Sequence, residues 1–169
     1  DIGRPDIPII RDPVPLKDGA DILIMESTYG NRLSPAYPES EKELKRIVNE
    51  TVSRGGSLLI PAFSVGRTQQ LVYAFHKLCN DRLIPDIPIF VDSPLATRTT
   101  DIFRLHPEVY DAEIREFLLT DDDNNPFGFN RLQYIQTVEQ SKALNSLQVP
   151  AVIISASGML EGGRILHHL

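Results

Sequence analysis

The sequence has a single cysteine, Cys79, and no long apolar run. One cysteine excludes an internal disulfide, and because Cys79 lies in the apolar pattern of an expected helix, we interpret it as a buried thiol in a reducing compartment. The longest apolar stretches, SLLIPAF and AVIISA, are too short to span a bilayer. The first residues lack the order of charged, apolar and small residues that marks a signal peptide. These features predict a cytoplasmic protein without a membrane partner.

Positive charge is also scarce. The 17 Lys and Arg residues are outnumbered by 23 Asp and Glu residues, which gives a formal net charge of -6 at pH 7. This balance argues against nonspecific coating of nucleic acid, although it leaves room for a local cluster of Arg and Ser. A length of 169 residues with 41% hydrophobic content supports one domain with a real core. Because the chain begins with Asp and ends on an apolar HHL segment, we interpret it as an excerpt from a longer protein.

The order of the predicted elements indicates an α/β fold. Residues 1–18 are rich in proline and are expected to form an extended connector. Runs of β-branched and other apolar residues predict five strands, and helical spacing follows most of them. Because strands that alternate with helices form βαβ units, we expect a mostly parallel sheet flanked by helices. The predicted strands lie within 22–25, 57–63, 88–94, 132–137 and 151–157.

Short capping patterns predict where helices begin. Ser40 with Glu43, and Thr137 with Gln140, have the spacing of capping boxes. A last helix is expected from the glycine pair at 162–163 to the end of the sequence. The acidic stretch that begins at 121 is expected to be an exposed, solvated turn.

Hydroxyl-bearing residues follow every predicted strand. In parallel sheets ligands bind outside the carboxyl ends of the strands, where helix N-termini also present free N–H groups. Together these ends predict a surface for a polyanion, with Arg67 and Arg164 as countercharges. Taken singly, Ser40, Ser64 and Thr137 are better explained as helix N-caps, and close packing of a helix on the sheet is enough to explain the glycine pair. The strand ends are 26–28, 64–67, 92–94, Thr137 and 155–158.

Glu26 and the histidines are the residues that could belong to a metal site. Glu26 follows a strand expected to be buried, so its carboxylate should have an arginine, a metal or a metal-bound histidine as partner. His167 and His168 are adjacent, and on a helix they would point about 100° apart, so they do not chelate one metal from the same side. We interpret them as an ordinary helix face. His76 and His106 have no ligand spacing.

Five segments in order, DIG, ILIMESTYG, PAFSVGRTQQLVYAF, PIFVDSPLA and ISASGMLEGGRILHHL, resemble the metallo-β-lactamase superfamily. The resemblance is to its β-CASP branch of RNA-processing nucleases, and most of all to the bacterial and archaeal members. It implies that residues 1–30 are a short piece of a metallo-β-lactamase αββα domain and that residues 31–169 are an incomplete, Rossmann-like β-CASP domain. In that family the β-CASP domain packs over the metal site and forms one wall of the RNA cleft.

The resemblance implies a zinc-dependent RNA phosphodiesterase with two Zn²⁺ ions in the complete protein. Asp1 would bridge the metals, and Glu26 would support a metal-ligating histidine. The family's HxHxDH motif and its later histidine motifs do not occur in this sequence. We therefore expect the excerpt alone to bind no zinc tightly and to be inactive. The residues expected to hold substrate phosphates and sugars are Ser64, Arg67, Ser93, Ser155, Ser157, Gly158 and Arg164.

Two alternatives stay open at this point. A β-CASP homologue without metals would serve as an interaction subunit of an RNA-processing complex, and the HxHxDH region of the complete protein would distinguish it. A nucleotide or small phosphoester binder is disfavoured because neither the dinucleotide-binding glycine pattern nor a Lys-bearing P-loop occurs. The expected partner is single-stranded RNA or a 3′-end processing substrate. Endo- or exonucleolytic cleavage, acceptance of DNA and the oligomeric state, including a homodimer, are left undecided by the sequence.

Overall fold

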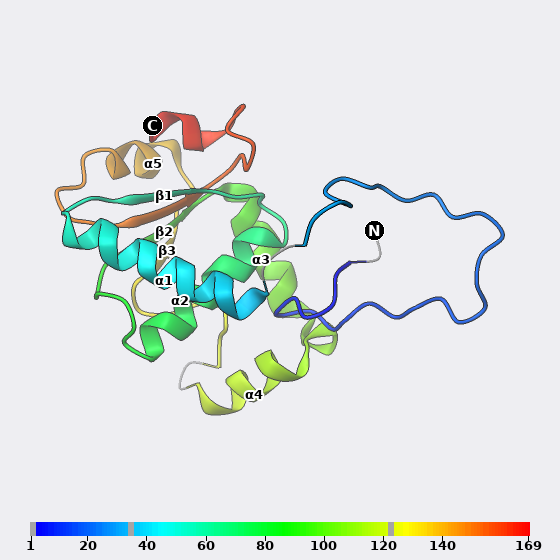
Figure 1. Ribbon diagram of the computed structural model, residues 1–169. Helices are drawn as coiled ribbons and strands as arrows, with labels where there is room; N and C mark the ends of the chain where they lie inside the picture. The colour runs from blue at the N-terminus through cyan, green and yellow to red at the C-terminus, as the bar shows by residue number, and fades with distance from the viewer. Residues whose placement is uncertain (1–2, 34–35, 122–123) are drawn as a thin grey trace.

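The described residues of the computed structural model form a four-stranded parallel sheet with the strand order β1-β4-β2-β3 (Figure 1). The structure describes residues 3–33, 36–121 and 124–169. The expected α/β class with a parallel sheet flanked by helices is confirmed. The strands are β1 (Leu58–Pro61), β2 (Ile89–Asp92), β3 (Leu132–Tyr134) and β4 (Val152–Ser155).

Helices connect these strands in the expected order. Thr137 caps α5 by accepting a hydrogen bond from the Gln140 backbone N–H, while the Gln140 side-chain oxygen accepts one from the Thr137 backbone N–H, so this capping box is confirmed. The Ser40 box is wrong, because α1 begins earlier, next to Pro38, and Ser40 lies inside the helix. The helices are α1 (Tyr37–Ser53), α2 (Arg67–Asn80), α3 (Pro94–Leu105), α4 (Ala112–Thr120) and α5 (Val138–Leu144), with the 3₁₀ helices η1 (Pro107–Val109) and η2 (Arg164–His167).

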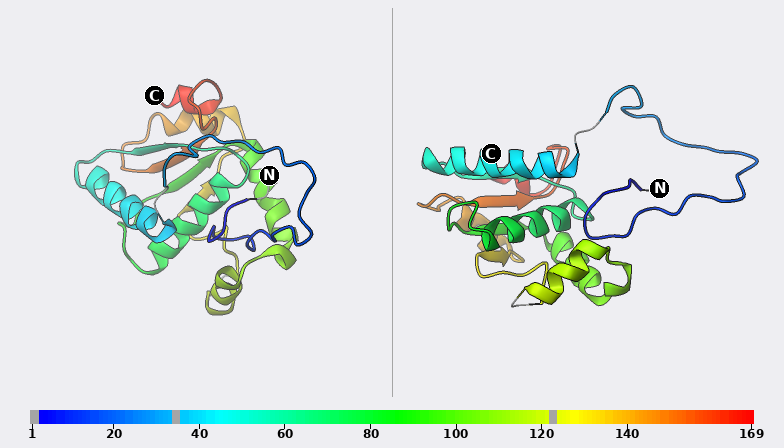
Figure 2. Two further views of the ribbon diagram at one scale, coloured as in Figure 1. Left: turned by 45° about the vertical axis from the view of Figure 1, so that its right-hand side comes forward. Right: turned by 60° about the horizontal axis from the view of Figure 1, so that its bottom comes forward.

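Both faces of the sheet are covered, because successive side chains of each strand point to opposite faces. Ile89 and Val91 pack into the larger core with α1 and α2, whereas Phe90 packs with Leu144 of α5. The two views in Figure 2 also place α1 and α2 on one side of the sheet and α5 on the other. This double burial explains why β2 and β4 are apolar at nearly every position. Among the helices of the described residues, none is long and apolar enough to cross a membrane.

The strand predicted at residues 22–25 is wrong. These residues belong to the long loop that extends away from the sheet (Figure 1), and Ile22 and Ile24 are 81% and 92% exposed. A strand is stable only when a neighbour completes its hydrogen-bond ladder, and the described sheet offers this segment none. Earlier in the same connector, Ile9 is buried and Ile10 makes an antiparallel bridge with Tyr110.

Two further expectations need correction. The last predicted helix forms only the short 3₁₀ helix η2, because Gly163 adopts a positive φ that breaks the helical path just before Arg164. The acidic turn is not simply solvated, since the Asp121 side chain is 6% exposed and its Oδ1 lies 3.2 Å from His76 Nε2. Cys79 is half-buried, and desolvation raises the pKa of its thiol to about 11.

Candidate functional site

The loops that follow β1, β2 and β4 meet at one edge of the sheet and enclose a pocket of about 440 Å³. All four strands run parallel, so their carboxyl ends lie at this edge. β4 is inserted between β1 and β2, and such a reversal of strand order opens a crevice where α/β proteins bind ligands. We call this the strand-end pocket; its lining residues are Ser64, Asp92, Ser93, Pro94, Leu95, Arg98, Ala156, Gly163 and Arg164.

Two serine hydroxyls meet in the strand-end pocket. Ser93 caps α3, and its Oγ accepts a hydrogen bond from the Ala96 N–H at 3.1 Å. Ser64 Oγ lies 2.9 Å from Ser93 Oγ. The interpretation of Ser64 as a helix cap is wrong, because Gly66 is the N-cap residue of α2. The Ser64 hydroxyl is therefore held by its hydrogen bond with Ser93 and not by a role as a helix cap.

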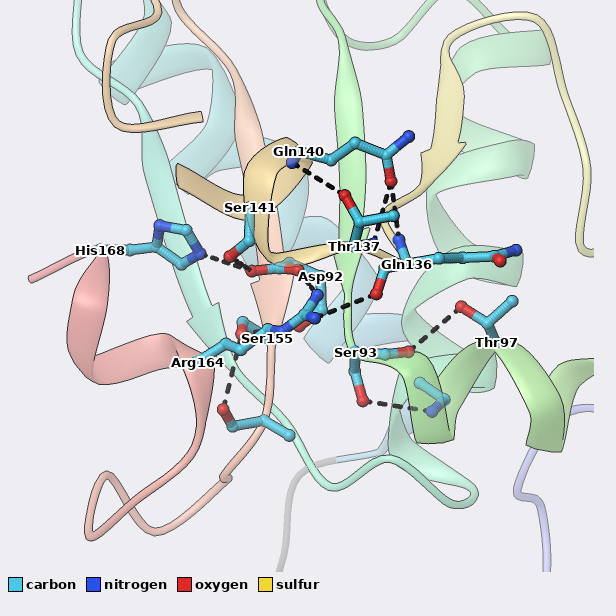
Figure 3. Close-up of polar contacts among 12 residues, drawn as sticks. Asp92, Ser93, Thr97, Gln136, Thr137, Gln140, Ser141, Ser155, Arg164 and His168 are labelled. Carbon is cyan, nitrogen blue, oxygen red and sulfur yellow. Dashed lines mark hydrogen bonds and ion pairs between the residues drawn. The ribbon is translucent and has the colours of Figure 1, made fainter. Parts of the chain in front are cut away.

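Asp92 is the buried acidic residue of the site, with 0% exposure. Arg164 Nη1 donates to its Oδ1 at 2.7 Å, and His168 Nε2 lies 2.8 Å from its Oδ2 (Figure 3). The Ser141 hydroxyl donates to the same Oδ2 at 2.5 Å. A buried carboxylate is tolerated when it is paired and fully hydrogen-bonded, as this one is. Asp92 thus anchors the chain end at Arg164 and His168 to β2.

The His168 ring is the last member of this group, which we call the Asp92 cluster: Asp92, Ser141, Arg164 and His168. His168 Nδ1 lies 2.6 Å from Asn145 Oδ1, and the orientation of that amide is set by Asn145 Nδ2, which donates to the His167 carbonyl at 2.8 Å. Both ring nitrogens therefore lie within hydrogen-bond distance of a side-chain oxygen, Asn145 Oδ1 on one side and Asp92 Oδ2 on the other. The interpretation of His168 as an ordinary helix face is wrong, since its side chain is 1% exposed.

Sequence reasoning missed Asp92, His168 and Arg98. Asp92 ends an otherwise apolar strand, IFVD, which is the same pattern that makes Glu26 a candidate. His168 gave no signal, because its partner lies 76 positions earlier in the chain. Arg98 projects from α3 into the lining of the strand-end pocket and is exposed. Within residues 3–33, 36–121 and 124–169, no hydrogen bond or ion pair engages its guanidinium group.

The residues predicted to contact substrate divide into groups. Ser64, Ser93 and Arg164 line the strand-end pocket together. Ser155 lies beneath it, 1% exposed, and its Oγ donates to the Asp92 carbonyl at 2.9 Å. Arg67 is not brought to this pocket; its side chain lines a separate groove between α1 and α2.

The loop at 156–163 supplies the remaining predicted residues. Ser157 Oγ accepts a hydrogen bond from the Met159 N–H at 3.2 Å. Gly158 lies against Phe63, where a Cβ atom would sit 3.1 Å from the Phe63 backbone nitrogen. Gly163 has φ 82°, and a Cβ there would fall 2.4 Å from the Ala156 carbonyl oxygen. The loop therefore folds back on itself through a position that only glycine fits.

The two residues predicted to serve a metal centre are not part of this pocket. Glu26 is exposed on the long loop, and its Oε2 accepts a hydrogen bond from the Thr28 N–H at 2.5 Å. The expected burial of this carboxylate is therefore wrong for this chain, and its role beside a metal ligand stays a prediction. Asp1 lies outside the described residues. Among the residues that are described, no three His, Cys, Asp or Glu side chains form a group that could hold a metal ion, so they do not fit such a centre by themselves.

Comparison with known proteins shows which family this chain resembles in sequence. A family model described as the Beta-Casp domain matches residues 68–169. Ribonuclease TTHA0252 from Thermus thermophilus is 37% identical over 169 residues, which is 100% of this chain and 38% of that protein. Transcription termination factor FttA from Methanosarcina mazei is 32% identical over 150 residues, or 88% of this chain and 23% of that protein.

A further relative, the RNase J-like protein from Methanocaldococcus jannaschii, is 31% identical over 154 residues, which is 90% of this chain and 34% of that protein. The chain thus spans less than two fifths of the length of each of these three relatives.

Proposed function

The chain belongs to the Beta-Casp family, and on this basis we propose that the complete protein is an RNA-processing ribonuclease whose substrate contacts the strand-end pocket. The β-CASP nuclease family is metal-dependent in general. The names of the relatives support the proposal, since they include a ribonuclease, an RNase J-like protein and a transcription termination factor. RNA is accordingly the proposed substrate.

The observation that carries the proposal is the set of donors around the strand-end pocket. The hydroxyls of Ser64 and Ser93 and the guanidinium groups of Arg98 and Arg164 line it together. Phosphate oxygens accept hydrogen bonds, and arginine is suited to them because its charge strengthens each bond. The single carboxylate in the lining, Asp92, is already engaged by Arg164 and by His168.

The charge of the pocket follows from these pairs. The Asp92 carboxylate is paired with the Arg164 guanidinium, and Arg98 adds a positive charge that no ion pair among the described residues offsets. This local positive charge stands in a chain whose formal net charge is -6. A confined cationic pocket on an acidic protein favours one phosphate at one place over general adhesion to nucleic acid.

The finer parts of the proposal concern the complete protein. Two Zn²⁺ ions would activate water and stabilise charge on the phosphate when bound. They would be held by residues other than the described ones, with Asp1 among them, and Glu26 would support a ligand. A single-stranded or 3′-end processing RNA, a cytoplasmic location and a homodimer likewise stay predictions.

Hydrolysis of single-stranded RNA by the complete protein tests the proposal. Arg98→Gln removes one charge-assisted phosphate contact, and we expect kcat/KM to fall about 10-fold, as for a bond of about 1.5 kcal/mol. Arg82→Gln is the matched control, because Arg82 is exposed in the turn after α2, at the opposite edge of the sheet. It changes the net charge equally and should leave kcat/KM unchanged.

Equal effects of the two substitutions, or none, would contradict the assigned surface. A chelator should abolish hydrolysis, and persistent activity would contradict metal dependence. RNA binding without any hydrolysis would favour the alternative of a β-CASP homologue that acts as an interaction subunit.

A further inference from the structure

Phe63 is an exposed aromatic residue directly before Ser64, which lines the strand-end pocket. The sequence contains seven Phe and five Tyr residues. In the part of the chain that the structure describes, only Tyr29 and Phe63 among them are exposed, at 65% and 57%. Tyr29 lies on the long loop and has the Arg32 guanidinium 3.8 Å from its ring centre. Phe63 therefore calls for a separate explanation.

The Phe63 ring is held in place by the loop that contains Gly158 and by hydrogen bonds to the Phe63 backbone. A Cβ atom on Gly158 would lie 3.2 Å from Phe63 Cδ2 and 3.3 Å from Cε2, so the backbone of the 156–163 loop lies directly against the ring. The Phe63 carbonyl accepts hydrogen bonds from the Thr68 N–H at 3.2 Å and from Thr68 Oγ1 at 2.8 Å. Both restraints hold the ring in place while more than half of the residue stays accessible to solvent.

Two segments next to Phe63 contribute to the lining of the strand-end pocket. Ser64 follows Phe63 directly in the chain and lines the pocket. The loop that backs the ring begins at Ala156, which lines the same pocket. The chain on either side of this held ring therefore leads into a pocket that carries arginine and hydroxyl groups. Each nucleotide of an RNA strand likewise carries a base beside its phosphate.

We propose that Phe63 is a stacking platform for one unpaired base of a single-stranded RNA whose phosphate occupies the strand-end pocket. This inference rests on the proposed function and deepens it by naming the conformation of the substrate. Unpaired bases present their faces to aromatic side chains, whereas bases within a duplex are already stacked on one another. Because every base has such a face, Phe63 selects for single strands with little preference for sequence.

Substitutions at Phe63 in the complete protein test the inference. Phe63→Leu keeps an apolar side chain and removes the ring, and we expect the Kd for a single-stranded RNA to rise about 5- to 150-fold. Phe63→Tyr keeps the ring and should leave the Kd within about 2-fold of the wild type. Leu119→Ala is a control for loss of exposed apolar surface, because Leu119 on α4 is 87% exposed; its Kd should not change.

RNAs with a single abasic position identify the stacked base. For the wild type, one abasic position should weaken binding by the same factor as Phe63→Leu, and in the Phe63→Leu protein that penalty should disappear. If Phe63→Leu weakens binding but leaves the abasic penalty intact, Phe63 only orders its loop and stacking is overturned.

Other outcomes separate the inference from the proposed function. RNA binding that depends on Arg98 but is indifferent to Phe63→Leu would refute stacking and leave the proposed function standing. Equal loss of binding for single-stranded and duplex RNA would also refute it. Failure of the wild type to bind any RNA would overturn both, and Phe63 would then be assigned to contact with another protein segment.

Discussion

Replacing Asp92 with asparagine tests how much the negative charge of this residue contributes to stability. The substitution keeps the shape of the side chain but removes the negative charge that pairs with Arg164 at 2.7 Å and with His168 at 2.8 Å. In one orientation the new amide nitrogen would face the Arg164 Nη1 donor, and in the other it would face the Ser141 hydroxyl, which can accept from it. The ion pair with Arg164 is lost in either orientation of the amide.

The expected loss of stability follows from the burial of the partners. Removing one partner of a buried ion pair costs about 3–5 kcal/mol, because the other charge is left uncompensated. The Arg164 side chain is 21% exposed and can regain some hydration, which places the expected loss near the lower limit, about 3 kcal/mol. With a urea m value of about 2 kcal/mol/M, the unfolding midpoint should fall by about 1.5 M.

Urea unfolding followed by circular dichroism measures this shift. Asp86→Asn is the matched control, because Asp86 forms an ion pair with Arg131 in which both side chains are largely exposed. Exposed pairs contribute little, so the control midpoint should hardly move. A midpoint for Asp92→Asn that lies within error of the wild type would refute the reasoning that a buried charge network anchors the end of the chain.

Three smaller predictions concern individual residues outside the Asp92 cluster. Gly163→Ala should destabilise the protein by about 2 kcal/mol or more in urea titrations, because the position adopts a glycine-only conformation and a Cβ would meet the Ala156 carbonyl, whereas Gly162→Ala, with nothing within 4 Å, should be tolerated. Thr137→Ala should cost about 1 kcal/mol through loss of the α5 cap, and Thr137→Ser should restore it. Since burial raises the pKa of Cys79 to about 11, roughly one thiol in a thousand is ionised at pH 8, so alkylation should be slow in the folded protein and fast in urea; equal rates would contradict the burial.

Local patterns predicted those parts of the fold that depend on local chemistry. The capping box at Thr137 needs only residues three positions apart, and it was correct. The parallel sheet followed from alternation of elements, and it was correct as well. Residues 22–25 have the same apolar character as the true strands but no neighbour in the described sheet to pair with. Apolar character indicates that a segment can be buried, but it does not indicate which strand the segment pairs with.

In the candidate site, too, features set by local sequence were predictable and contacts between distant residues were not. The serines at the strand ends were predictable, because the carboxyl ends of parallel strands share one edge. The Asp92 cluster was not, since Arg164 and His168 lie 72 and 76 positions away from Asp92. The two predicted arginines diverge for a geometric reason: Arg67 begins α2 and faces the groove shared with α1, whereas Arg164 is drawn toward Asp92.

The salt dependence of RNA binding tests the central claim most directly. The dissociation constant of the complete protein for a single-stranded RNA would be measured over a range of salt concentrations for the wild type, Arg98→Gln and Arg82→Gln. If the strand-end pocket binds a phosphate, the slope of log K against log salt should shrink by about 0.7 for Arg98→Gln and stay at the wild-type value for Arg82→Gln. Identical slopes for all three proteins would contradict a phosphate in this pocket.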